Sequence, residues 1–120
     1  LINSNETLSL VISDVNKDVE LDQLGTPSEV GQTLIDKVIA PEGSGRSVKL
    51  INANQREDEK HVFYDLEYEL NLNEQDRHEL ATVVIDRGSL YTFAVGTNEE
   101  RWNKVEKMFK NVIESFNFLI

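Results

Sequence analysis

The stretch VFYDLEYELNL, residues 62–72, decides the fold of this 120-residue chain. Every second position from Val62 to Leu72 is apolar, while the alternate positions from 65 to 71 are acidic or polar. Successive side chains of a β-strand point to opposite faces, so this alternation predicts a long strand with one buried face. We expect the other face, with Asp65, Glu67 and Glu69, to be solvated and neutralised by nearby lysines, although such a row could also collect calcium.

The residues that follow this strand predict an antiparallel meander. A turn is expected at residues 73–76, before the stretch LATVVI at 80–85, which is apolar on both of its faces. The sequence Asp86-Arg87-Gly88-Ser89 is typical of a tight hairpin, and it leads into a further strand over residues 90–95.

The N-terminal half contributes two more extended segments. Residues 7–15 alternate between apolar and smaller or polar side chains, which predicts a strand with one well-buried face, formed by Leu8, Leu10 and Ile12. A second extended stretch opens at residues 48–51 and reaches a charged turn at residues 57–60.

Two amphipathic helices flank these strands. Thr26-Pro27-Ser28-Glu29 has the pattern of a capping box with proline at the first helical position, and that helix stops at Pro41. Thr97-Asn98-Glu99-Glu100 repeats the capping pattern before the longer helix. The apolar face of the first helix comprises Val30, Leu34, Ile35, Val38 and Ile39, and that of the second Trp102, Val105, Phe109, Val112, Ile113 and Phe116.

The order strand, helix, meander, helix predicts an α+β sandwich, in which a central antiparallel sheet is covered by helices. A chain of 120 residues is expected to form one domain over its whole length, residues 1–120. The apolar residues at its end, 116–120, are expected to be extended or packed.

Charge and composition exclude several classes of function. Against 12 basic residues the chain carries 22 acidic ones, a net charge of −10, which opposes binding to nucleic acids or to anionic membrane surfaces. It has no cysteine, which excludes disulfides, thiolate nucleophiles, iron–sulfur clusters and cysteine-based zinc sites.

Catalytic patterns are absent from the sequence, so we expect a protein that is not an enzyme. The two histidines, His61 and His78, lie outside any nucleophile motif. His78, in Asp76-Arg77-His78-Glu79, is interpreted first as a surface histidine and second as a weak ligand for a divalent metal. His61, beside Lys60, is the weaker candidate.

Opposite charges gather on two segments. The loop from Asp14 to Asp22 is acidic, whereas the second helix has a basic solvent face, with Arg101, Lys104, Lys107 and Lys110. Such faces steer and orient a protein partner in a salt-dependent way. Solvated faces with nothing docked on them are the alternative.

Several short matches, in this order along nearly the whole chain, together resemble the PsbP family of extrinsic photosystem II proteins, most closely its cyanobacterial members and the plant PsbP-like proteins. The matching stretches are Leu8 to Ile12, Leu24-Gly25-Thr26-Pro27-Ser28-Glu29-Val30, Ile39-Ala40-Pro41 with Ser44-Gly45-Arg46-Ser47, Arg77-His78, Gly88-Ser89-Leu90-Tyr91-Thr92, Glu100-Arg101-Trp102 and Ser115-Phe116.

The resemblance implies an α/β/α sandwich on a central antiparallel sheet. It further implies a preceding segment with Tyr-Pro and Gly-Trp motifs that supplies a hairpin, and we expect that segment to be missing here. A protein of the thylakoid lumen, peripheral to the thylakoid membrane, is implied as well. In cyanobacteria this would include a lipid anchor, whose cysteine would lie in the missing part.

As function, the resemblance implies binding to photosystem II, with retention of calcium and chloride or assistance in assembly. Ion retention in the plant proteins depends on an N-terminal extension that is not part of this chain, which favours assembly or stabilisation. It also implies a site for zinc or manganese near His78 and Glu99.

Two hypotheses result. The first is a non-catalytic accessory protein that docks to photosystem II core or assembly-intermediate subunits through Arg101, Lys104 and Lys107. The second is a weak carrier or sensor of divalent zinc, manganese or calcium, centred on His78 and Glu99.

Overall fold

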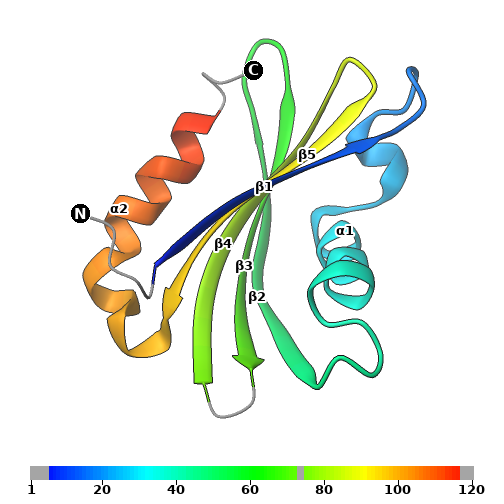
Figure 1. Cartoon of the computed structure of the whole chain (residues 1–120). Helices are drawn as coiled ribbons and strands as arrows, with labels where there is room; N and C mark the ends of the chain where they lie inside the picture. The colour runs from blue at the N-terminus through cyan, green and yellow to red at the C-terminus, as the bar shows by residue number, and fades with distance from the viewer. Residues whose placement is uncertain (1–5, 73–74, 117–120) are drawn as a thin grey trace.

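The computed structural model of the chain describes residues 6–72 and 75–116 and contains one five-stranded antiparallel sheet with a helix on each face (Figure 1). The strands are β1 (Thr7–Asp14), β2 (Arg46–Glu57), β3 (Val62–Leu72), β4 (Gln75–Asp86) and β5 (Ser89–Asn98). The α-helices are α1 (Pro27–Leu34) and α2 (Trp102–Ser115), and shorter helical turns are η1 (Leu21–Leu24), the π-helical η2 (Ile35–Ile39) and η3 (Glu99–Arg101).

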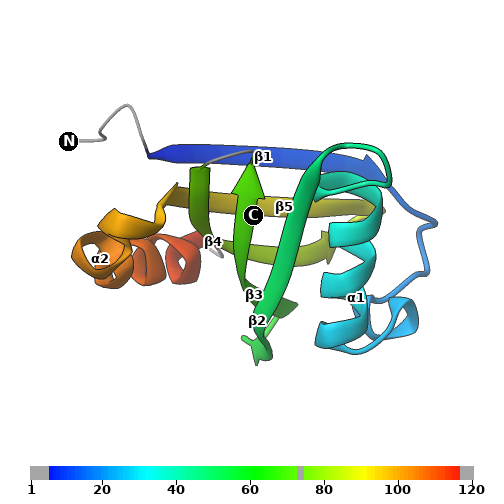
Figure 2. The same ribbon diagram turned by 90° about the horizontal axis from the view of Figure 1, so that it is seen from below.

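The sheet has the order β1-β5-β4-β3-β2, and all of its neighbours are antiparallel. Strands β2 to β5 form the expected meander, and β1 lies beside β5 at the far edge. Viewed from below, the sheet separates the two helices, with α1 packed on β2 and β3 and α2 packed on β4 and β5 (Figure 2). The expected α/β/α sandwich is therefore confirmed.

Strand β3 supplies buried residues to both layers: its even-numbered positions form the expected buried face, and Phe63 is buried on the opposite one. Tyr64, Leu66 and Tyr68 face α1, together with Ala81 and Val83 of β4. On the opposite face, α2 and the sheet share an aromatic cluster. It comprises Phe63 and Phe93 of the sheet, Trp102 and Phe109 of α2, and Phe116 directly after α2. Within this cluster the rings of Phe93 and Phe116 stack 4.8 Å apart.

The start of α1 confirms the predicted capping box. The Thr26 hydroxyl accepts a hydrogen bond from the Glu29 backbone N–H at 3.2 Å, and the Glu29 carboxylate accepts one from the Thr26 N–H at 2.9 Å. Helical structure continues through η2 to Ile39, so its end before Pro41 is also confirmed.

The second predicted capping box is wrong. Thr97 belongs to β5 and is fully buried, and its hydroxyl donates to the Glu6 carboxylate at 3.2 Å instead of capping a helix. Residues 99–101 form η3, whose first residues receive no side-chain cap from Asn98. Asn98 has the extended N-cap geometry, but its side-chain oxygen accepts hydrogen bonds from Gln75 and Arg77 instead of from the start of the helix.

Two further expectations about strands need correction. Strand β1 is exposed along its entire length, because neither helix packs extensively on it, so its predicted buried face does not exist among the described residues. The turn expected at 73–76 is shorter, because Gln75 and Asp76 already pair with Leu72 and Asn71 in the β3–β4 ladder. Residues 73–74, like the end of the chain at 117–120, lie outside the described residues.

Neither α1 nor α2, nor any other helix in the described ranges, has the length and apolar character that crossing a bilayer requires.

Candidate functional site

His78 lies inside the α2 layer rather than on the surface, which corrects its first interpretation. It sits in β4 directly between Glu69 of β3 and Thr97 of β5, and it is only 4% exposed. Its ring stacks on the indole of Trp102 with 3.8 Å between the centroids and 17° between the planes. Because Trp102 opens α2, this stacking fixes the histidine between the sheet and the helix.

Both nitrogens of the His78 ring face carboxylates. Nδ1 lies 2.9 Å from Oε2 and 3.0 Å from Oε1 of Glu99, and Nε2 lies 2.6 Å from Oε2 of Glu67. Ionised carboxylates only accept hydrogen bonds, so a ring that carries protons on both nitrogens would satisfy both contacts. The same geometry could hold a cation in place of the proton on Nδ1.

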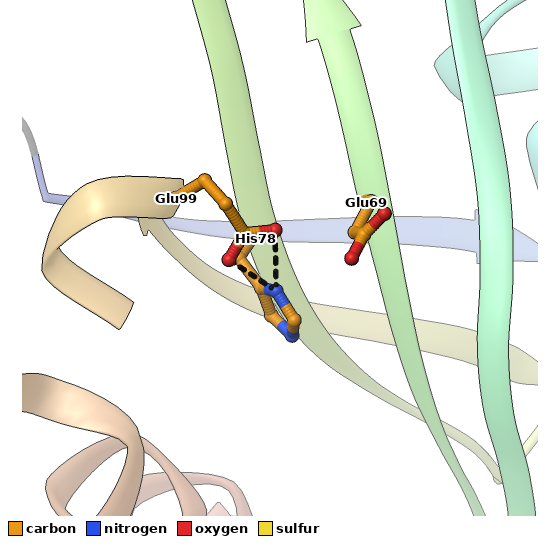
Figure 3. Close-up of side chains that lie close together, drawn as sticks. All are labelled: Glu69, His78 and Glu99. Carbon is orange, nitrogen blue, oxygen red and sulfur yellow. Dashed lines mark hydrogen bonds and ion pairs between the residues drawn. The ribbon is translucent and has the colours of Figure 1, made fainter. Parts of the chain in front are cut away.

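Glu69 completes a set of three potential ligands with His78 and Glu99. One ligand atom from each side chain lies within 4.8 Å of the other two, and Figure 3 shows the three side chains turned toward one another. A ring nitrogen with two carboxylates is a donor set that zinc and manganese accept. Glu67 would then hold Nε2–H and orient the ring, as outer carboxylates do for metal-binding histidines.

This cluster opens to solvent. Glu69 and Glu99 line a pocket of about 470 Å³ at the end of β2, β3 and β4, together with Lys49, Asp76 and other residues of these strands. The pocket thus gives solvent access to the two carboxylates, whereas His78 does not line it.

The acidic row on β3 is neutralised mainly within the α2 layer, although two lysines also lie near it, Lys49 opposite Glu69 and Lys110 near Glu67. Asp65 accepts two hydrogen bonds from Arg56 at 2.8 and 3.2 Å, and the guanidinium lies 4.2 Å above the Phe63 ring. Glu67 pairs with His78, and only Glu69 of the three is exposed. Asp65 and Glu67 thus each have a specific partner, and Glu69 faces the pocket.

The predicted partner-binding residues fall into two groups. Lys104 and Lys107 are exposed on α2, and no carboxylate of the described residues lies within ion-pair distance of either. Arg101 instead donates a 2.7 Å hydrogen bond from Nε to Glu6, whose side chain is 3% exposed. This bond raises the pKa of Arg101 and ties η3 to the start of β1. Whether these residues bind a partner stays a prediction.

Lys110 and His61 are the remaining candidates. Lys110 is paired with Glu106 one turn earlier on α2 at 2.6 Å, and this hydrogen bond raises its pKa. His61 lies at the opposite end of β3 from the His78 cluster, with its Nε2 2.8 Å from Asp86. The two histidines therefore do not share a site.

Sequence reasoning missed Glu67, Glu69 and Trp102 as neighbours of His78. Their signal was present in the alternation of β3 and in the first apolar position of the helix. Which carboxylate faces His78, however, depends on the register between β3 and β4, and the sequence alone does not specify that register.

The fold and the site define a class: an antiparallel α/β/α sandwich whose buried His–Glu cluster opens to a pocket. The profile of the PsbP family matches residues 1–118, and the chain belongs to the PsbP family. CyanoP of Thermosynechococcus vestitus is 40% identical over 97% of this chain, and CyanoP of Synechocystis sp. is 38% identical over 98%. The chain spans 66% and 63% of the lengths of these relatives.

Two solved structures and a plant relative are also similar to this chain. The solution structure of CyanoP from Synechocystis sp. superposes with a TM-score of 0.81 at 37% identity, over 96% of this chain and 68% of that one. PsbP-like protein 1 of Arabidopsis thaliana is similar at 29% identity, over 96% of this chain and 49% of its own length. A crystal structure of PA94 from Pseudomonas aeruginosa, with TM-score 0.56 and 14% identity over 88% of this chain and 80% of that one, shares the fold alone.

Proposed function

We propose that this chain is a non-catalytic accessory protein of photosystem II, docking to its core or assembly-intermediate subunits on the lumenal side of the thylakoid membrane. There it assists the assembly or stability of the oxygen-evolving complex. The resemblance of the sequence to the PsbP family and its likeness to CyanoP support the setting. Peripheral attachment through a lipid anchor outside this chain fits the same proposal.

The observation that carries the docking role is the free pair Lys104 and Lys107. In this chain of net charge −10, some cationic side chains are neutralised internally, as Arg56, Arg101 and Lys110 are, whereas others on separate elements, such as Lys17 and Lys37, are exposed. Lys104 and Lys107 stay unpaired among the described residues, one turn apart on an exposed helix face. They are therefore available to an acidic partner surface. Such contacts would orient the partner more than they would increase the affinity of the complex.

The test is capture of photosystem II subunits from solubilised thylakoid membranes by the immobilised chain, at low and at high salt. We expect capture that salt weakens and that is lost in Lys104→Glu/Lys107→Glu. The matched control is Lys17→Glu/Lys37→Glu, which makes the same change in net charge at two exposed lysines far from α2. Equal loss in both variants would mean that net charge alone decides binding, and capture that salt leaves unchanged would contradict the docking role.

The second candidate function is weak binding of divalent zinc, manganese or calcium, favoured by the convergence of Glu69, His78 and Glu99. The nitrogen ligand selects zinc or manganese over calcium, which prefers an all-oxygen set. A carrier or sensor role would follow from the open pocket beside the ligands.

Isothermal titration with zinc and with manganese tests this candidate. Saturable binding on the order of micromolar is expected, with loss in His78→Ala and no change in the matched variant His61→Ala or in Lys104→Glu/Lys107→Glu. Retained affinity in His78→Ala would place the ion elsewhere.

A further inference from the structure

The chain contains a single sulfur atom, and this atom belongs to a surface residue. Met108 is the only methionine of the sequence, which has no cysteine. Methionine commonly fills irregular gaps in protein cores, but neither of the two hydrophobic clusters contains it. Met108 is instead 46% exposed on α2. Its thioether is therefore open to reagents in the solvent.

Met108 lies beside the two unpaired lysines of α2. Residues three and four apart on a helix are surface neighbours, so Lys104 adjoins both Lys107 and Met108. In the described part of the chain α2 packs on β4 and β5, and these three side chains lie on its solvent side (Figure 2). Met108 is also the one large hydrophobic side chain that α2 exposes. We call Lys104, Lys107 and Met108 the docking face.

We propose, on the basis of the docking role described above, that Met108 is the apolar contact of the docking face and that its oxidation by a peroxide releases the partner. Methionine is enriched at protein interfaces, and its flexible thioether adapts to the surface that it meets. Two cations flank this thioether. The partner that fits is therefore a protein surface with an apolar position among carboxylates.

Oxidation of Met108 by hydrogen peroxide is a two-electron step that yields methionine sulfoxide and water. A lone pair of the sulfur attacks one oxygen of the peroxide, so that the S–O bond forms as the O–O bond breaks. The departing hydroxide takes the proton from the oxygen now bound to sulfur and leaves as water. Competition within the chain is small, because it has no thiol and Trp102 is buried.

The sulfoxide changes the docking face in two ways. A polar group replaces the apolar thioether, so the contact with an apolar position of the partner is lost. The new oxygen accepts hydrogen bonds and lies within reach of the Lys104 ammonium one turn earlier, where it competes with the carboxylates of the partner. The fold itself should be unaffected, because Met108 belongs to neither hydrophobic cluster.

Treatment of the purified chain with hydrogen peroxide, followed by removal of the reagent, tests the oxidation. Intact-mass spectrometry should show the addition of one oxygen atom, and Met108→Leu, which has no sulfur, should show none. Urea unfolding should be the same before and after treatment. A methionine sulfoxide reductase, supplied with a dithiol as the source of electrons, should remove the added oxygen as water.

Capture of photosystem II subunits from solubilised thylakoid membranes tests the effect on docking. Oxidised chain should bind about tenfold more weakly than untreated chain, as expected for loss of a central interface contact, and the reductase should restore binding. Met108→Leu should bind like the untreated chain and stay insensitive to peroxide. Met108→Gln should bind weakly without any treatment. The matched control Val38→Gln makes a similar apolar-to-polar change at a residue of η2 that is 57% exposed, and it should leave capture unchanged.

The outcomes separate this proposal from the docking role. If the untreated chain captures no photosystem II subunit, the docking role fails and the release by oxidation fails with it. If capture is lost in Lys104→Glu/Lys107→Glu but is equally strong before and after oxidation, the docking role stands and the role of Met108 is overturned. Peroxide that weakens capture by Met108→Leu as much as by the unaltered chain would overturn it as well.

Discussion

The two faces of the sheet are built from the same strands but hold different chemistry. The α1 face is largely apolar, and its polar groups include the phenols of Tyr64 and Tyr68, which donate to the Gly25 carbonyl and to Glu79, and the buried Arg77, which also pairs with Glu79. The α2 face instead encloses charged side chains within its aromatic cluster, above all Arg56 with Asp65 and His78 between Glu67 and Glu99. Both layers contribute to the hydrophobic core, but the α2 layer alone holds the cluster of His78 with Glu67 and Glu99.

The largest effect is expected on the α1 face. Leu66 is 2% exposed and packs in the α1 cluster against Tyr64 and Ala81. Leu66→Ala should lower the free energy of unfolding by about 2–5 kcal/mol, because it removes buried methyl groups and leaves a cavity. Urea unfolding followed by circular dichroism measures this. Zinc affinity of the folded variant should not change, and a change would break the division between the two faces.

The next effect tests the charged cluster of the α2 face. His78→Leu keeps the volume near Trp102 but leaves Glu67 and Glu99 without their shared partner. We expect a loss of about 1–3 kcal/mol in the free energy of unfolding, since partly buried carboxylates lose their hydrogen bonds.

A double variant separates charge from packing in this cluster. In His78→Leu/Glu67→Gln the carboxylate that lost its contact with Nε2 is replaced by a neutral amide, so part of the lost stability should return. Equal stabilities of the single and double variants in urea titrations would mean that His78 acts through its stacking on Trp102 alone.

A smaller effect concerns the polar edge of the α1 face. The Tyr68 hydroxyl donates to Oε1 of Glu79 at 2.9 Å, and burial, with Glu79 nearby, raises the pKa of Tyr68. Tyr68→Phe should reduce stability by about 1 kcal/mol at neutral pH, as Glu79 loses a donor.

The raised pKa of Tyr68 also gives a signed pH response. The unfolded chain releases the phenolic proton first, so the contribution of Tyr68 is complete below the ordinary tyrosine pKa and declines as the pH rises toward the raised one. The free energy of unfolding of Tyr68→Phe should therefore decline less steeply with rising alkaline pH than that of the unaltered protein. An identical alkaline profile would show that Tyr68 is not the group responsible.

The elements of the fold could be predicted where local chemistry decides them. The alternation at residues 62–72 and the capping box at Thr26 each depend on neighbouring residues alone, and both are confirmed. The exposure of β1 could not be predicted in this way. Its alternation shows that Leu8, Leu10 and Ile12 share a face but not that α2 stops at β5.

The candidate site was predictable in part for the same reason. His78 was singled out by its acidic neighbours in the sequence and Glu99 through a resemblance, whereas the contributions of Glu67 and Glu69 follow from the pairing of β3 with β4. Arg101 shows a different limit of prediction from the sequence. Its charge suggested an external partner, but Glu6, 95 positions earlier in the chain, lies within hydrogen-bond distance of it. Contacts between distant segments require the folded structure.

The smallest effect is expected at the start of α1, where the charged side chain of Glu29 takes part in the capping box. The hydrogen bond from the Thr26 backbone N–H, with a second contribution from the Thr26 hydroxyl, lowers the pKa of Glu29. Its folded-state pKa lies below the unfolded one, so the stability it adds is present above the unfolded pKa and is lost as the pH falls through the folded one. Glu29→Gln retains an acceptor for the capping box but does not titrate. We therefore expect a shallower loss of stability between neutral pH and about pH 3 than in the unaltered protein, by urea titrations at both pH values.

The difference should be small because Glu29 is exposed and solvent screens its charge. A steeper acid limb in Glu29→Gln would contradict the assignment.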